Sequence, residues 1–111
     1  MISIEALRDQ GVDVKTGLAL CMNNEAFYLR LVAKALEDVT FEKLVQAIEA
    51  GDLNTAFEAA HALKGVMANL SLTPIHEPVA EITELLRSRT EMDYSEHLRR
   101  INEGRERLRN L

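Results

Sequence analysis

The longest apolar-periodic run in the chain extends from Asp52 to Leu70. Its apolar residues recur at steps of three and four positions, which is the spacing of one face of an α-helix packed in a bundle. They are Leu53, Ala56, Phe57, Ala60, Leu63, Met67 and Leu70. The run therefore predicts a long helix whose apolar side is covered by other helices.

Capping residues, glycines and prolines divide the rest of the chain into further helical segments. We expect short helices over Ile4–Gln10 and Asp13–Cys21, and longer ones from Asn23 or Asn24 to Glu37, Thr40 to Gly51, Thr73 to Arg87 and Asp93 to Arg109. The expected N-caps are Ser3, Asp13, Asn23 or Asn24, Thr40, Asp52 and Thr73, the last with Pro74 at the first helical position. This predicts an all-α fold, an antiparallel four-helix bundle with one or two short extra N-terminal helices, in which residues 1–111 form one domain.

The apolar stripes of these segments predict which side chains are buried. They include Phe27, Leu31, Val32, Ala35 and Leu36, then Phe41, Leu44, Val45 and Ile48, then Val79, Ile82, Leu85 and Leu86, and finally Leu98, Ile101 and Leu108. Pro78 lies too deep for the first turn of its helix, and we expect it to distort the start of that helix. The arginines between Arg99 and Arg109 are interpreted as a solvated helix face, with a contact for an acidic partner as the alternative.

His61 lies on the outer side of the long helix. At about 100° per residue it is about a third of a turn or more from the centre of the apolar stripe, so its side chain faces solvent or a groove edge. Glu58, Lys64, Gly65 and Ala68 share that outer side. A glycine inside a helix costs about 1 kcal/mol relative to alanine, and here it clears the approach to the imidazole. Such a face suits a histidine that carries a phosphoryl group, or it is an ordinary surface histidine beside an ordinary lysine.

The segment His61-Ala62-Leu63-Lys64-Gly65, followed by Ala68-Asn69-Leu70, resembles the signature of histidine-containing phosphotransfer (HPt) domains. Residues 25–32 and 47–52 resemble the first bundle helices of that family and the turn before its histidine helix, so the likeness covers nearly the whole chain. The sequence departs from the family pattern at Val66 and Met67, at Ser71, where glycine is frequent, and at Pro78 and Thr83. These departures concern the turn after the histidine helix and the start of the next helix.

The resemblance implies a phosphorelay intermediate in two-component signalling. His61 would accept and donate the phosphoryl group, Lys64 would neutralise its oxygens, and Gly65 would provide steric access. The partners would be receiver domains of response regulators or of a hybrid histidine kinase, and they would supply Mg²⁺, because the chain itself needs no cofactor. Candidates for the docking surface are Phe57, Glu58, Ala62, Ala68, Asn69 and Gln46.

Composition excludes several other functions. Eighteen acidic against thirteen basic residues give a formal net charge of −5, which disfavours a nucleic-acid binder. The lone Cys21 sits among apolar residues and is expected to be a small buried hydrophobe. The three histidines have no metal-site spacing, and no nucleotide-binding loop is recognisable, so neither a metal site nor autonomous ATP-dependent kinase activity is expected.

No signal peptide or membrane span is recognisable, which predicts a soluble, cytoplasmic protein, expected to be a monomer. The alternative function is a non-catalytic helical adaptor or dimerisation module, because a helical fold by itself decides nothing about activity. The Lys64-Gly65 pair beside His61 distinguishes the two readings, since a pure adaptor has no need of it.

Overall fold

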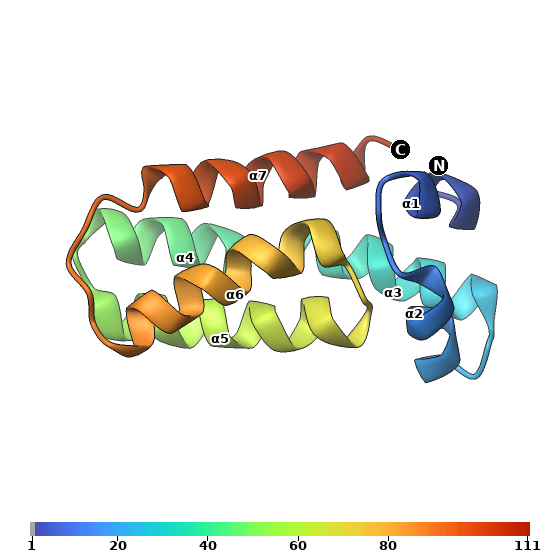
Figure 1. Ribbon diagram of the computed structural model, residues 1–111, viewed down its shortest axis with the longest axis horizontal. Helices are drawn as coiled ribbons and strands as arrows, with labels where there is room; N and C mark the ends of the chain where they lie inside the picture. The colour runs from blue at the N-terminus through green and yellow to red at the C-terminus, as the bar shows by residue number, and fades with distance from the viewer. Residues whose placement is uncertain (1) are drawn as a thin grey trace.

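The computed structural model describes residues 2–111 and contains seven α-helices within that range. They are α1 (Ile4–Asp9), α2 (Val14–Leu20), α3 (Glu25–Leu36), α4 (Thr40–Glu49), α5 (Leu53–Asn69), α6 (Thr73–Arg87) and α7 (Ser95–Arg109). Figure 1 shows α4 to α7 side by side and alternating in direction, with α1 and α2 at one end. The all-α bundle with two short N-terminal helices is confirmed.

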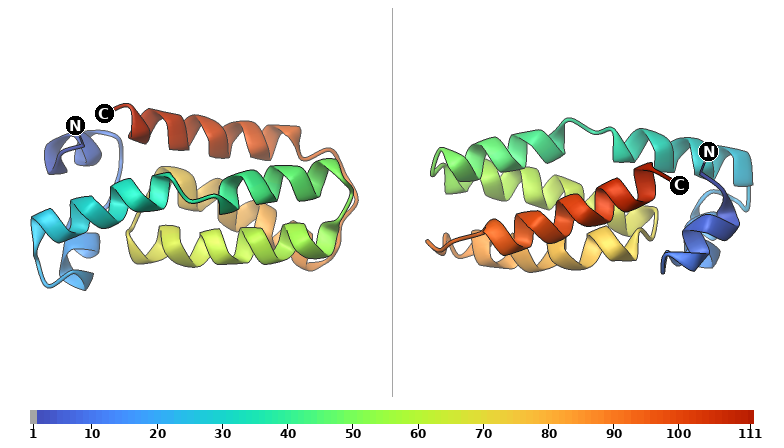
Figure 2. Two further views of the ribbon diagram at one scale, coloured as in Figure 1. Left: turned by 180° about the vertical axis from the view of Figure 1, so that it is seen from behind. Right: turned by 90° about the horizontal axis from the view of Figure 1, so that it is seen from above.

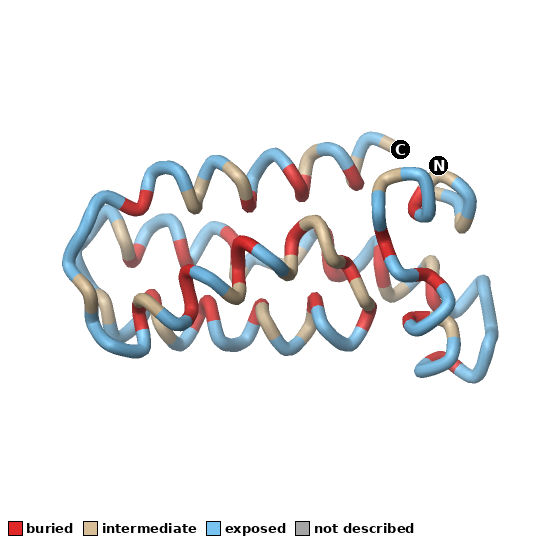
Figure 3. Tube along the Cα trace, in the orientation of Figure 1, coloured by how far each residue is buried: buried red, intermediate tan, exposed pale blue. Residues whose placement is uncertain are grey.

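The helices α3 and α4 run in the same direction, end to end, as the view from behind in Figure 2 shows. Together they make the first of four columns, and α5, α6 and α7 are the other three. The strongest packing joins α5 to both α6 and α4, and α7 closes the bundle against α6. The inward sides of the columns are buried and their outward sides are exposed, as Figure 3 shows.

Local capping was predictable at four helix starts. The side chains of Ser3, Asp13, Asn24 and Asp52 each accept a hydrogen bond from a backbone amide three residues later. The expected Thr40 cap is wrong, because Thr40 is the first residue of α4 and its amide donates to the Asp38 carboxylate at 2.8 Å. The expected Thr73 cap is also displaced by one residue, since Thr73 already belongs to α6 and Leu72 precedes it.

The buried side of α3 differs from the prediction, because Tyr28 and not Phe27 enters the core. The Tyr28 hydroxyl donates to the backbone carbonyl of Leu70 at 2.8 Å and so ties α3 to the end of α5. A Cβ at Gly17 would lie 2.6 Å from the Tyr28 ring, so that glycine makes room for the tyrosine. On α4 the expected Val45 is exposed, and a buried alanine takes the inner position two residues later.

Pro78 does not interrupt α6, which is continuous from Thr73 to Arg87. Proline has no amide hydrogen, so the Pro74 carbonyl four residues earlier has no helical donor. The space beside this carbonyl is taken by α7, where a Cβ on Gly104 would lie 3.2 Å from the Pro74 oxygen. The helices α6 and α7 thus approach closely at Gly104, beside the carbonyl that Pro78 leaves without a helical donor.

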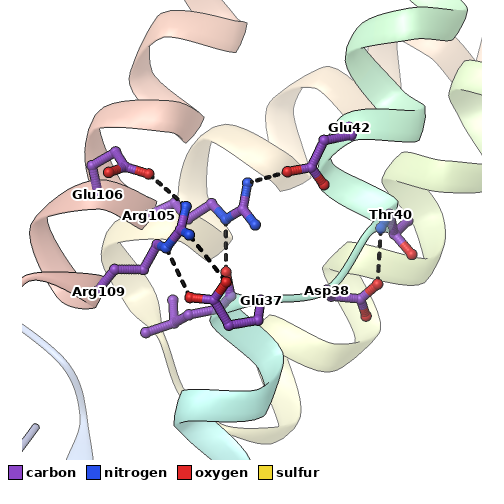
Figure 4. A network of polar contacts seen from close by, with 8 residues as sticks. Glu37, Asp38, Thr40, Glu42, Arg105, Glu106 and Arg109 are labelled. Atoms are coloured by element: carbon purple, nitrogen blue, oxygen red, sulfur yellow. Dashed lines mark hydrogen bonds and ion pairs between the residues drawn. The ribbon is translucent and has the colours of Figure 1, made fainter.

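The arginines of α7 are not all solvated, because Arg105 is buried. Its Nε donates to the Leu36 carbonyl at 2.7 Å and its Nη1 to Glu42 at 2.9 Å, while the guanidinium lies 4.4 Å from the centre of the Phe41 ring. Figure 4 shows these bonds at the break between α3 and α4. The hydrogen bond from Arg105 also holds the pKa of the Glu42 carboxyl below its usual value. Arg105 therefore supplies the donor that the interrupted helix lacks at Leu36.

Replacement of Arg105 by methionine is expected to lower the free energy of unfolding by about 2–3 kcal/mol, because it leaves the Leu36 carbonyl without a donor and removes the stack on Phe41. Urea denaturation with an unchanged m-value would measure this loss. The matched control is Arg107→Gln, which removes an exposed arginine from the same helix. Equal stability of the two variants would show that the bridge at the helix break contributes nothing.

Candidate functional site

The middle of α5 presents His61 to solvent. The other side of the same helix is packed in the core, where Ala60 and Leu63, which precede and follow His61 in the sequence, are buried. Glu58, Ala62 and the other outward positions of α5 are exposed as well. The histidine therefore stands on a rigid element with nothing of its own helix closing over it.

Gly65, one turn after His61, adjoins open space. Apart from Gly65 itself, its two chain neighbours and the adjacent backbone of α5, no described atom lies within 4 Å of the position that a Cβ would occupy there. Its backbone is helical, so the fold needs neither the small size nor the conformational freedom of glycine at this position. Ala68 lies about one turn further along the same face and is also exposed. The outer side of α5 thus offers a histidine followed by a stretch with almost no side chains.

The Lys64 side chain is directed to the neighbouring helix. Its Nζ lies 3.7 Å from Glu84 Oε1 on α6, and the same carboxylate accepts a hydrogen bond from Arg87 Nε at 3.0 Å. The bond from Arg87, with a smaller contribution from Lys64, holds the pKa of the Glu84 carboxyl below its usual value. Glu84 is therefore ionised at neutral pH, and Lys64 shares it with Arg87.

Phe57, one turn before His61, stacks against the imidazole. The two ring centres are 5.6 Å apart and the ring planes differ by 24°. The guanidinium carbons of Arg87 and Arg89 each lie 5.0 Å from the centre of the Phe57 ring. The half-buried phenylalanine thus contacts the histidine and two cations from the end of α6.

Sequence reasoning placed Phe57 near His61 but missed Glu84, Arg87 and Arg89. The four-residue spacing of Phe57 and His61 was a readable signal, because such pairs are neighbours on a helix. The other three reach the site only through the antiparallel pairing of α5 with α6, which no local spacing encodes.

Of the expected docking residues, Gln46 lies on another face and Asn69 lies at the border of the face around His61. Gln46 lines a groove between α4 and α7 together with Leu98 and Ile101, so the structure does not bring it to His61. Asn69, the last residue of α5, borders a groove with Lys34 of α3. The face around His61 is thus made by α5 itself and the end of α6.

Among the described residues, the other two histidines have different surroundings from His61. His97 lies 3.9 Å from Glu81 on the α6–α7 side, and His76 borders a small hollow with Asp13 and Ala68. Among residues 2–111, no three histidine, cysteine, aspartate or glutamate side chains converge as metal ligands. Across that same range no helix combines the length and apolar character needed to cross a membrane.

Comparison with known proteins identifies one family. The family model of the Hpt domain matches residues 28–111, from the second turn of α3 to the end of the chain. Membership in this family implies phosphotransfer in two-component signalling, with receiver domains as partners. No curated protein and no solved structure matches the chain. Since the match covers well over half of its length, the chain belongs to the Hpt domain family.

Proposed function

We propose that this protein is a phosphorelay intermediate whose phosphoryl carrier is His61. The observation that carries the proposal is the exposed imidazole beside the open space at Gly65, on a helix whose other side is fixed in the core. A neutral imidazole nitrogen attacks the phosphorus of an aspartyl phosphate in a partner receiver domain. The bond between phosphorus and the aspartate oxygen breaks, and the carboxylate leaves with its electron pair. Transfer to a second receiver reverses these steps.

Phosphoryl transfer of this kind requires positioning and charge neutralisation more than covalent machinery. The Mg²⁺ of the receiver supplies the larger share of the positive charge. Lys64 adds a cation within reach of His61, because it lies one turn away on the same face. Its present partner, Glu84, is half-exposed, and exposed ion pairs contribute little free energy, about 0–1 kcal/mol. Lys64 can therefore exchange Glu84 for the phosphoryl oxygens at low cost.

The docking partner is a receiver domain of a response regulator or of a hybrid histidine kinase. The surface that it would cover comprises Phe57, Glu58, Ala62 and Ala68, with Asn69 at its edge. Small exposed residues on this side of α5 allow close approach of a second protein to the imidazole. The proposed working unit is a cytoplasmic monomer that uses no ATP of its own.

The test is incubation with a phosphorylated receiver domain and Mg²⁺, followed by mass mapping of acid-labile phosphate. We expect the label on His61 and none on His76 or His97. Absence of label with several receivers would instead favour the helical adaptor without phosphate chemistry. A label on either of the other histidines would refute the assignment of the carrier.

Glu84→Gln is expected to raise the rate of transfer to His61 by up to about five-fold, since the energy of one exposed ion pair bounds the gain. The reason is that Lys64 is then free to meet the incoming phosphoryl group. Rapid-quench measurement of the labelled fraction gives the rate. Glu81→Gln, which removes the same charge one turn earlier on α6, is the control. Identical rates for the two variants would argue against competition between Glu84 and the phosphoryl group for Lys64.

A further inference from the structure

Arg89 adopts a backbone conformation that favours glycine. It follows the end of α6 with φ +52°, in the left-handed region that a side chain disfavours. Its amide donates to the Leu86 carbonyl at 2.9 Å, and the Thr90 amide donates to the Leu85 carbonyl at 3.1 Å. This is the helix-ending motif in which glycine is the usual residue at the left-handed position. The left-handed backbone at Arg89 is strained where glycine would not be, which points to a role for the arginine side chain.

The Arg89 side chain reaches back to the start of α5. Its Nε donates to Asn54 Oδ1 at 2.5 Å, and its Nη1 donates to the Leu86 and Arg87 carbonyls at 2.7 and 3.2 Å. Three hydrogen bonds thus fix the guanidinium plane, which lies 5.0 Å from the centre of the Phe57 ring. The turn after α6 is joined in this way to the helix that carries the histidine.

Phe57 lies between Arg89 and His61 and contacts both side chains. The ring stacks on the imidazole from the turn before it, while the turn after it is open at Gly65. An exposed histidine without such a neighbour samples several side-chain rotamers. A ring held on one side restricts the imidazole to orientations that face the open side.

We infer that Phe57 and Arg89 are positioning residues for the phosphoacceptor: Arg89 holds the Phe57 ring, and the ring holds the His61 imidazole toward the open space at Gly65. This inference rests on the proposed function, because the orientation is useful only if a receiver approaches from that side. The inference adds to the proposed function that the transfer step depends on the turn that joins α6 to α7. Phe57 touches the ring that carries the reacting nitrogen, and Arg89 acts on that ring only through Phe57.

The experiment uses Phe57→Leu and Arg89→Gly, with Phe57→Tyr as the conservative rescue. Arg89→Gly removes the side chain and also relieves the left-handed backbone, so its urea midpoint should not fall. NMR of the unphosphorylated proteins reports the His61 ring protons, which a stacked aromatic ring shifts upfield. Transfer from a phosphorylated receiver is measured in parallel, as the rate at saturating receiver and as KM.

We expect Phe57→Leu and Arg89→Gly to move the His61 ring resonances toward those of a free histidine. Both should also lower the saturating rate about ten-fold, since a misoriented imidazole slows the transfer step. KM should change little in Arg89→Gly, because Arg89 lies outside the proposed docking surface. Phe57→Tyr should keep the wild-type resonances and rate. Ser71→Gly also introduces glycine at a left-handed position (φ +57°), the one after α5; it is the matched control and should change neither the resonances nor the rate.

Unchanged His61 resonances in Phe57→Leu and Arg89→Gly would overturn the inference, and so would shifted resonances with a wild-type saturating rate. A purely structural role of Arg89 would lower the urea midpoint of Arg89→Gly, and it would not lower the saturating rate at an unchanged KM. If the wild-type protein accepts no phosphoryl group, the proposed function fails. The NMR arm would still decide whether the two residues orient the imidazole.

Discussion

Replacement of His61 by glutamine is expected to remove the phosphoryl label completely and to change the free energy of unfolding by less than about 1 kcal/mol. Glutamine has no nucleophilic nitrogen, so the carrier atom is lost. The side chain is exposed, and its removal takes away the stack on Phe57. Glutamine also has a slightly better helix propensity than histidine, which offsets part of that loss.

Two measurements check this expectation. The labelled fraction after incubation with a phosphorylated receiver gives the activity, and urea denaturation gives the stability. His76→Gln is the control, because it removes a half-buried histidine from α6 and should retain the label. Label persisting in His61→Gln would mean that another residue carries the phosphoryl group. A variant that unfolds would contradict the argument that His61 is exposed and contributes little to the stability of the fold.

The features that the sequence predicted well are those set by neighbours along the chain. The caps at Ser3, Asp13, Asn24 and Asp52 depend on a side chain and an amide three residues apart, so they are visible in the sequence. The exposure of His61 follows from the buried stripe of its own helix. Ser71, where the family often has glycine, has φ +57°, so this departure falls at a backbone position that suits glycine.

The features that the sequence missed depend on contacts between distant segments. Tyr28 enters the core in place of Phe27 because Gly17 and the Leu70 carbonyl fit its ring and hydroxyl. Arg105 is buried because the break between α3 and α4 leaves a carbonyl for it. On apolar spacing alone, phenylalanine is the better core residue and arginine a surface residue.

The candidate site divides in the same way. His61, Gly65 and Phe57 come from one helix, and their relation follows from its period. Glu84 and Arg89 come from the next helix and its end, and their distance from His61 is set by how α6 packs against α5. The sequence could therefore predict the exposed face around His61 but not the cations and the carboxylate at its border.

Gly65→Leu is expected to slow phosphoryl transfer about 100-fold, because a bulky side chain beside His61 keeps the receiver from reaching the distance at which transfer occurs. The same change should raise the free energy of unfolding by about 0.5–1 kcal/mol, since leucine is a much better helix former than glycine. The position of the new Cβ is open in the described structure, so the first carbon of the side chain meets no packing strain that would oppose this gain. Activity and stability are thus expected to move in opposite directions.

Gly65→Ala separates the two causes. Alanine should stabilise the helix at least as much as leucine but adds only one methyl group, so its transfer rate should lie between those of the wild type and the leucine variant. Asn102→Leu, at an exposed position of α7, controls for a new surface leucine. If both Gly65 variants transferred at the wild-type rate, steric access would not limit the reaction. If both were equally slow, backbone flexibility at Gly65, and not the space beside His61, would be the property that transfer requires.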